Sequence, residues 1–317
     1  MSRTIPVTVV IPNYNSGAYL VECVESINRG TRPEQIVIVD DVSTDGSDEV
    51  ASHLASEYGN VEVVRRDENG GAVEARRTGV KRAACDWIAL VDADDTVEEG
   101  AVAAAFDRVL DTGCDLCVWQ LWKTDGERLW HLVPLDPADF PMTGREAARR
   151  TLGGWQMHPL GLARKSLYAD AYAGFREPGY NADELLTRRV LLRATAVGLC
   201  NKKYFYRLNP SSTSVGLHRH RVDVLDSQRW LVRFTIENFS RPDVIRAVEV
   251  AIGTGWATYQ QRRALGTSEV RRRMSGLMTE LGHHMQLRDW PRMRPGHIVA
   301  YIFLRTWSRL PTGGVKT

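Results

Sequence analysis

Three aspartates directly follow an apolar run in the first third of the chain. Residues 87–91 form a run short enough for a buried strand, and Asp92, Asp94 and Asp95 come next. Carboxylates at such a position are costly to desolvate unless a cation or hydrogen-bond donors compensate them. In open α/β sheets, ligands lie just beyond the carboxyl ends of the strands. Asp92 and Asp94 could there supply oxygen ligands to a divalent cation that also holds a diphosphate.

The same residues also allow a purely structural interpretation. Asp95 and Thr96 could open a surface helix through Leu110, with the aspartates capping it. Short motifs of this kind often arise by chance. A ligand site therefore requires further polar residues at the ends of neighbouring strands.

Such residues do follow other strand-like runs. The run at residues 7–11 ends in Pro12, which cannot donate to a strand ladder, and the run at 35–39 enters Asp40 and Asp41. Another run covers residues 61–64, and stretches with helical spacing separate the runs. Strands that alternate with helices predict an α/β fold with a mainly parallel central sheet.

Four segments together resemble a known family: V-V-I-P-N-Y-N, I-V-I-V-D-D-V-S-T-D-G-S, N-G-G-A-V-E-A-R-R-T-G-V and A-L-V-D-A-D-D. In order and spacing they resemble family 2 inverting glycosyltransferases of the GT-A fold, of the type that builds bacterial cell-surface polysaccharides and teichoic acids. The match covers residues 5–110 and continues more weakly to 215, through Y-R-L-N-P-S-S-T-S. The resemblance implies a GT-A domain over residues 1–215 and a helical region over 216–317.

The resemblance also implies a donor and a metal. The donor would be a nucleotide sugar, with UDP favoured because the Asp41 carboxylate can accept the imide N–H of uracil. Asp94 would bind Mn²⁺ or Mg²⁺, supported by Asp92, and water and phosphates would complete the coordination. The donor-binding positions that the resemblance implies are Pro12, Tyr14, Asn15, Asp41, Arg76, Asp92 and Ala93.

An acidic pair supplies the candidate general base. In the family, two acidic residues precede L-[FL]; here Ala182 takes the first position and Asp183 the second, with Glu184 as a fallback. The alternative is that Asp183 or Glu184 only caps the apolar helix that runs to about Val197.

Other positions leave the family pattern or stay open. Arg77 replaces a common asparagine, and Gly161 replaces a lysine before L-x-R-K-S-L, which leaves the acceptor contacts undefined. Some relatives have a third, histidine metal ligand, for which His218 is the candidate; His220 lies close to it. Trp155 and His158 are interpreted as packing residues rather than as sugar platforms.

Composition limits the protein class. The 317 residues are 43% hydrophobic and 25% charged, and no apolar run approaches 18 residues. The five scattered cysteines disfavour a disulfide framework, and Cys114 and Cys117 lie in an expected strand. We expect a cytoplasmic protein, with peripheral contact at the inner face of the membrane as an option.

Charge is divided unevenly along the chain. Residues 216–317 hold 17 Lys and Arg against 8 Asp and Glu, a balance of +9, whereas residues 1–215 hold 24 against 31, a balance of −7. Helices are expected over four ranges: 222–239, 242–265, 267–287 and 296–309. The aromatic, basic stretch 297–310 could dock on a membrane, although packing on its own domain or on a dimer mate is favoured. Nucleic acid is excluded as a partner because no recognition motif accompanies the charge.

Two other function classes compete with the transferase. A sugar-phosphate nucleotidyltransferase needs a Gly-rich, Arg-containing phosphate loop after its first strand, where this chain has P-N-Y-N-S-G. A non-catalytic sugar-nucleotide-binding protein would bind donor without transfer. A polysaccharide, a lipid-linked molecule and a small molecule all remain open as the acceptor.

Overall fold

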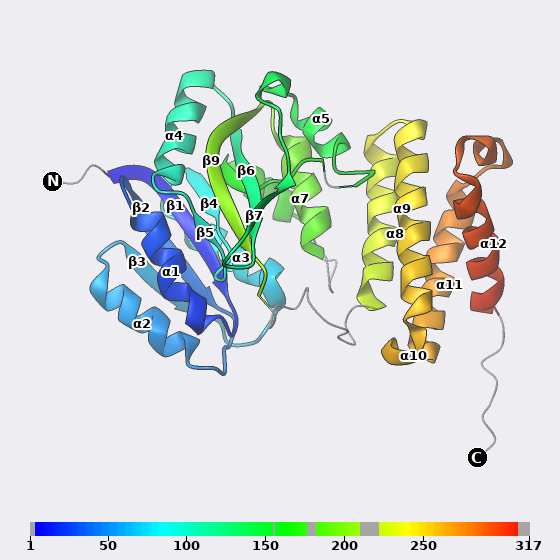
Figure 1. Ribbon diagram of the computed structural model, residues 1–317, viewed down its shortest axis with the longest axis horizontal. Helices are drawn as coiled ribbons and strands as arrows, with labels where there is room; N and C mark the ends of the chain where they lie inside the picture. Colours follow the sequence, from blue (N-terminus) through cyan, green and yellow to red (C-terminus); the bar gives the residue numbers. More distant parts are fainter. Residues whose placement is uncertain (1–3, 155, 176–181, 210–221, 310–317) are drawn as a thin grey trace, which may run out of the picture. The chain divides into compact units, whose positions relative to one another are not determined.

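The computed structural model describes residues 4–154, 156–175, 182–209 and 222–309 (Figure 1). The chain forms two compact units. The first, here called the sheet unit, comprises Met1–Ala148, Gln156–Phe175 and Leu186–Ser212. The second, the helical unit, comprises Arg149–Trp155, Arg176–Leu185 and Thr213–Thr317. The short segments 149–155 and 176–185 thus group with the C-terminal helices, although they precede residue 216.

One mixed sheet organises the sheet unit, with the strand order β3-β2-β1-β4-β8-β6-β9-β5 and with β7 paired to β6. Its strands are β1 (Thr4–Asn13), β2 (Arg32–Asp40), β3 (Val61–Arg65), β4 (Trp87–Leu90), β5 (Thr96–Val97), β6 (Leu116–Thr124), β7 (Leu129–Val133), β8 (Gly161–Arg164) and β9 (Val197–Arg207).

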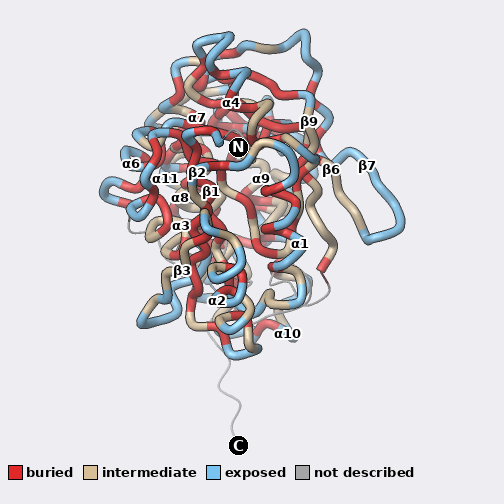
Figure 2. The backbone as a smooth tube through the Cα atoms, turned by 90° about the vertical axis from the view of Figure 1, so that its left-hand side faces the viewer, coloured by how far each residue is buried: buried red, intermediate tan, exposed pale blue. Residues whose placement is uncertain are grey.

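The predicted parallel arrangement holds for β3, β2, β1 and β4, and the central residues of β2, β1 and β4 are apolar and buried. β8 then enters antiparallel between β4 and β6, while β6 and β9 are again parallel to each other. β7 and the turn that joins it to β6 are largely exposed, whereas most of β6 is buried (Figure 2). Sequence alternation could predict these four strands because a helix follows each of β1, β2 and β3 and leads the chain to the next strand.

Helices of the sheet unit pack on this sheet. α3 contacts β1 and β2, and α4 contacts β6, β8 and β9. Where α4 contacts β6, the buried Trp119 indole N–H donates to the carbonyl of Ala101 at 3.0 Å. The helices between residues 17 and 193 are α1 (Gly17–Asn28), α2 (Ser47–Glu57), α3 (Gly71–Arg82), α4 (Ala101–Thr112), α5 (Gly144–Arg149), α6 (Lys165–Tyr172) and α7 (Ala182–Arg193). Arg149 of α5 and the first turn of α7 through Leu185 group with the helical unit.

The helix expected through Leu110 is present as α4, but it does not begin at Asp95 and Thr96. Thr96 and Val97 instead form β5, antiparallel to β9, and α4 begins only at Ala101, after Gly100 with φ of 72°. The aspartates after β4 are therefore not caps of α4, and the structural interpretation of this motif is wrong.

The helical unit contains α8 (Val224–Asn238), α9 (Arg241–Gln260), α10 (Arg262–Leu265), α11 (Thr267–His284) and α12 (Pro295–Arg309). These bounds agree with the four expected helical ranges, except that Gln261 separates α10 from α9. Apolar residues of these helices form one core cluster, which includes Val248, Ala251, Met274, Leu277 and Leu304. None of the helices that the structure describes is long and apolar enough to cross a membrane.

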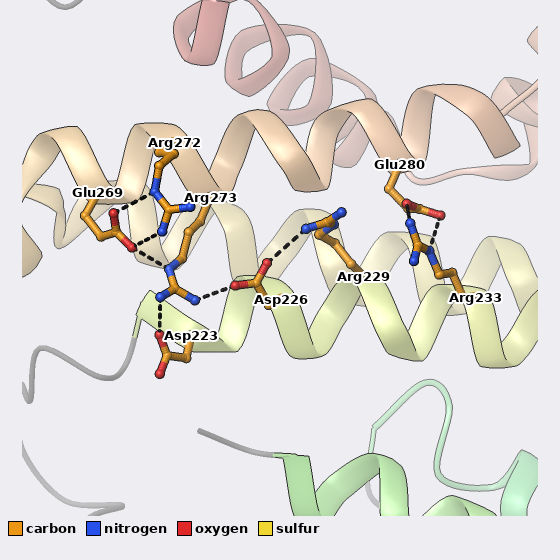
Figure 3. A network of polar contacts seen from close by, with 8 residues as sticks. All are labelled: Asp223, Asp226, Arg229, Arg233, Glu269, Arg272, Arg273 and Glu280. Atoms are coloured by element: carbon orange, nitrogen blue, oxygen red, sulfur yellow. Dashed lines mark hydrogen bonds and ion pairs between the residues drawn. The ribbon is translucent and has the colours of Figure 1, made fainter. Parts of the chain in front are cut away.

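Ion pairs join α8 to α11 (Figure 3). Arg273 of α11 pairs with Asp226 of α8 and with Asp223 just before it, and Arg233 of α8 pairs with Glu280 of α11. Hydrogen bonds from Arg272 and Arg273 lower the pKa of Glu269 to about 2. Part of the positive charge of the C-terminal region is thus neutralised within the helical unit.

Gly161 explains one departure from the family pattern. It begins β8, and an ideal Cβ at this position would lie 2.0 Å from the carbonyl oxygen of Cys117 on β6. That oxygen belongs to the backbone of a buried strand and cannot move away cheaply. The close approach of β8 and β6 therefore excludes a side chain at this position, where the resemblance implies lysine.

We expect Gly161→Ala to lower the free energy of unfolding by about 1–3 kcal/mol, the usual cost of overpacking a well-packed core. Urea denaturation measures the change. Gly59→Ala is the matched control, because nothing lies within 4 Å of its added Cβ. Equal stability of the two variants would contradict the close approach.

Candidate functional site

Three adjacent parallel strands end at the same edge of the sheet. β1, β2 and β4 are hydrogen-bonded neighbours, and β1 ends at Asn13, β2 at Asp40 and β4 at Leu90. Parallel strands direct the residues that follow them to one place. The polar segments 12–15, 40–45 and 92–95 consequently share one edge of the sheet.

The loop after β1 is fastened to the loop after β2. The Asn13 side chain donates to Asp40 Oδ1 at 3.0 Å, and the backbone N–H of Asn15 donates to Ser43 Oγ at 3.0 Å. Asn15 Oδ1 accepts the N–H of Thr44 at 2.7 Å, and Asn15 adopts φ of 53°, which asparagine tolerates better than most residues. The loop is thereby fixed with Tyr14 47% exposed, as a residue that meets a ligand would be.

Asp41 is buried but fully compensated. It forms an ion pair with Arg66, and its Oδ2 accepts the N–H of Gly71 at 2.7 Å. Oδ1 also accepts the N–H of Gly70 at 3.1 Å. The uracil contact expected of Asp41 stays a prediction, and a base N–H would have to join or replace one of these donors.

Arg76 and Asp92 meet at this edge. Arg76, from α3, donates through Nη2 to Asp92 Oδ1 at 2.7 Å, and the two side chains are 14% and 30% exposed. The structure thus brings together the residue expected to bind diphosphate and one of the two expected at the metal. Ala93, between the aspartates, is buried.

Asp95 is buried and anchors the segment to β9. Its carboxylate accepts the Tyr204 hydroxyl at 2.7 Å and the N–H of Arg207 at 2.8 Å. The Tyr204 oxygen also accepts the N–H of Asp92 at 3.1 Å. Burial, together with the charges of Asp92 and Asp94, raises the pKa of Asp95 well above its usual value.

Asp94 is half-buried and held by residues at the end of β9. Asn209 donates to its Oδ2 at 3.1 Å, and Arg207 Nε donates to its backbone carbonyl at 3.0 Å. Burial and the negative charge of Asp92 raise the pKa of Asp94. Both effects disfavour a bare carboxylate, and a nearby cation would offset them.

The donor set fits a hard divalent cation. Asp92 and Asp94 offer carboxylate oxygens, whereas no group of three or more His, Cys, Asp and Glu side chains in the described part of the chain could hold a metal alone. A metal bound here would take its remaining ligands from phosphate and water. His218, the expected third ligand, lies outside the described residues, as do His220 and Trp155.

Asp183, the candidate general base, does not belong to the sheet unit. It is half-buried in the first turn of α7, beside Glu184, and groups with the helical unit. Its role as general base stays a prediction.

Two other positions noted in the sequence have structural contacts in the sheet unit. Arg77, the departure from asparagine, pairs with Glu74 and donates to the carbonyl of Phe175 at 2.9 Å. His158 is 3% exposed, and burial lowers its pKa to about 4, in accord with a packing role.

Sequence reasoning missed four residues that shape the site. Asn13 ties β1 to β2, while Tyr204, Arg207 and Asn209 hold Asp92, Asp94 and Asp95. The available signal was the weaker Y-R-L-N-P-S-S-T-S match, which contains Arg207 and Asn209, but nothing in it indicates their partners.

Comparison with known proteins places these features in a family. A family model described as "Glycosyl transferase family 2" matches residues 8–163. YibD of Escherichia coli K12, described as an uncharacterized glycosyltransferase, is 30% identical over 250 residues, which cover 74% of this chain and 70% of YibD. Glycosyltransferase GlyG of Streptococcus pneumoniae serotype 4 is 28% identical over 218 residues, which cover 65% of this chain and 72% of GlyG.

A solved structure shares the fold. Residues 1–349 of S. aureus TarS, crystallised with UDP-GlcNAc, superpose with a TM-score of 0.66 at 17% identity. The superposition covers 96% of this chain and 92% of that one.

We expect Tyr204→Phe to lower the free energy of unfolding by about 1–3 kcal/mol, because buried Asp95 loses a donor and the Asp92 N–H loses its acceptor. Urea denaturation measures it, with Tyr58→Phe as the control at a half-buried tyrosine. Unchanged stability would show that Tyr204 does not hold the aspartates.

Proposed function

Since the chain belongs to glycosyl transferase family 2 and has the GT-A fold, we propose that this glycosyltransferase is metal-dependent and inverting and that it uses a UDP-sugar donor. The observation that carries the proposal is the meeting of Asp92 and Arg76 beside Asp94, where β1, β2 and β4 end. Opposite charges at this edge suit a diphosphate that is bound together with a cation.

Uridine is the favoured nucleoside. TarS was crystallised with UDP-GlcNAc and with UDP, which supports the same donor class for a chain of this fold. Pro12 lies in the last part of β1, which runs one residue beyond this proline, and Tyr14 and Asn15 lie in the loop after it; all three would contact the base. Asp41, with its carboxylate already oriented by Arg66, Gly70 and Gly71, would accept the uracil imide N–H.

Asp94 and Asp92 would hold Mn²⁺ or Mg²⁺. When bound, such an ion acts as a Lewis acid on phosphate oxygens. Arg76 would add a second positive charge at the same place, and its planar guanidinium matches phosphate geometry. Asn209 and Arg207 would keep Asp94 oriented for this role, through the hydrogen bonds described above.

The acceptor hydroxyl needs a base, and Asp183 is the proposed one. Its carboxylate would take the hydroxyl proton as that oxygen forms a bond to the anomeric carbon. The bond from this carbon to the diphosphate oxygen breaks on the opposite face, so the anomeric configuration inverts and UDP leaves. Asp183 lies in the first turn of α7.

The acceptor class is proposed only broadly, as a polysaccharide, a lipid-linked molecule or a small molecule with a free hydroxyl. The competing nucleotidyltransferase function would need a Gly-rich phosphate loop after β1. The residues at this place, P-N-Y-N-S-G, are instead hydrogen-bonded to Ser43 through Asn13 and Asn15. A protein that binds the donor but transfers nothing would be recognised by UDP affinity without hydrolysis or transfer.

We expect Asp94→Asn to weaken UDP binding at least tenfold in the presence of Mn²⁺, because one metal ligand loses its charge. UDP affinity without metal should stay nearly unchanged. Isothermal titration with UDP, GDP and TDP, each with and without Mn²⁺, makes the measurement. Asp107→Asn, an exposed position on α4, is the matched control.

Tight UDP binding that ignores the metal would contradict the metal assignment. A preference for GDP or TDP would instead contradict the role of Asp41.

We expect Asp183→Asn to reduce sugar transfer about a hundredfold or more, a usual contribution of a general base, while UDP affinity and the unfolding midpoint stay nearly unchanged. Asparagine keeps the shape and can still cap a helix, so the variant separates catalysis from capping. Transfer to acceptor and UDP binding are measured side by side, with Asp170→Asn on exposed α6 as the control.

If Asp183→Asn retains transfer and Glu184→Gln abolishes it, the base is Glu184. If both variants remain active, the base lies outside this pair.

A further inference from the structure

Helix α12 presents an apolar face to solvent as well as to its own unit. Tyr301 and Leu304 are 2% and 0% exposed and belong to the core of the helical unit. On the other side Val299, Ile302 and Phe303 are 68%, 48% and 41% exposed. Their spacing of three and four residues places them on one face of the helix. Packing on its own unit, which the sequence favoured for this stretch, therefore uses only part of the apolar surface of α12.

The exposed face continues onto α9. Trp256 of α9 is 37% exposed and makes an edge-on contact with Phe303, with ring centroids 5.5 Å apart. These four side chains, Val299, Ile302, Phe303 and Trp256, are called the apolar strip below. Contiguous exposed apolar side chains of this size, flanked by polar residues, are typical of interaction surfaces.

The segment that carries most of the strip has charges of a single sign, and the acidic residue opposite its start, Glu249 of α9, is paired with His297 and accepts the N–H of Arg294 at 2.7 Å. Residues 290–309 contain Arg292, Arg294, Arg305 and Arg309 and no Asp or Glu. Within the described part of the chain, none of these four arginines forms an ion pair. The arginines between α8 and α11 differ in this respect, because carboxylates pair with them (Figure 3). The positive charge beside the strip thus remains available to an external anion.

A hollow adjoins the strip. It measures about 390 Å³ and is lined by Trp290, Tyr301, Ile302, Arg305, Thr306 and Arg309. Arg305 donates to the Tyr301 hydroxyl at 2.9 Å, which orients its guanidinium beside the hollow. Two guanidinium groups, an indole and a hydroxyl form a lining that suits an anionic headgroup with an apolar attachment.

We propose that α12 lies in the interface of an anionic lipid bilayer, with the apolar strip toward the acyl chains and with Arg305 and Arg309 at the phosphates. An amphipathic helix with aromatic and aliphatic residues on one face and arginine beside them binds membranes in this way. Arginine near the surface gains about 1 kcal/mol from anionic lipid. The three-methylene stem of each arginine lets its charge stay at the headgroups while the strip enters below them.

A second copy of the chain is the main alternative occupant. A twofold interface places the same patch on both subunits, so it would bring the positive surface of one copy, which includes Arg305 and Arg309 beside the strip, against the same surface of the other. No acidic residue of segment 290–309 could compensate these charges. An anionic bilayer satisfies both the apolar strip and the charges, and the proposal does not depend on the donor or metal assignment.

The test is co-sedimentation of the full chain with vesicles of phosphatidylcholine alone and with 30 mol% phosphatidylglycerol, both at low and high salt. We expect binding to the anionic vesicles that weakens as salt increases. The triple variant Val299→Ser, Ile302→Ser, Phe303→Ser should lower the partition coefficient at least tenfold, because burial of several methylene groups is lost. Leu110→Ser, a position 61% exposed on α4, is the matched control.

The double variant Arg305→Gln, Arg309→Gln should lower binding to anionic vesicles about tenfold or more, at roughly 1 kcal/mol for each arginine. Arg128→Gln in the exposed turn between β6 and β7 is its control. No vesicle binding, or binding that the triple variant leaves unchanged, would overturn the proposal. If the unaltered chain self-associates and binds no vesicles, and the triple variant no longer self-associates, the strip would be assigned to a second copy. UDP affinity, measured on every variant, keeps a failure here separate from a failure of the donor site.

Discussion

The sheet unit depends on the placement of three carboxylates at the end of one buried strand. Asp92, Asp94 and Asp95 repel one another, and burial adds to the cost of their charge. Each is stabilised by a different group: an arginine from α3, an amide from the segment after β9, and a tyrosine hydroxyl within β9. The carboxylates can therefore stay close together only if elements from distant parts of the chain converge on them.

This requirement accounts for the position of β9. β9 pairs with β6 and β5, and its C-terminal half carries Tyr204 and Arg207 to the aspartates. Arg207 also pairs with Glu22 of α1 and lies over the ring of Tyr19, so that α1 is joined to the same place. The residues that stabilise the aspartates thus also hold α1, β4 and β9 together at this edge.

The sequence could predict the strands that alternate with helices along the chain. It could not predict which residues far apart in the sequence would pair in the fold. Residues 7–11, 35–39, 61–64 and 87–91 each show a mainly apolar run before a turn, and each run lies in a strand or ends within one residue of it. β5 has only two residues and owes its pairing to β9, more than a hundred residues away, so the local pattern suggested a helix instead. Likewise Arg66 beside Asp41 and Asn209 beside Asp94 are ordinary polar residues until the fold brings them close. Gly161 appeared as a missing lysine, and only the approach of β6 to β8 gives it a physical reason.

The arginines in the described part of the helical unit fall into two groups, those that pair with carboxylates and those that do not. In the α8–α11 pair, arginines meet carboxylates across the helices, and the pKa of Glu280 is lowered chiefly by its hydrogen bond from Arg233. In α12 the arginines have no such partners among the described residues, while the aliphatic and aromatic side chains beside them remain exposed. The two arrangements come from similar compositions, because both segments are rich in arginine and apolar residues. What separates them is the presence of acidic residues: Asp223, Asp226, Glu269 and Glu280 allow α8 and α11 to neutralise each other, whereas a segment without any acidic residue can be neutralised only by a partner from outside it.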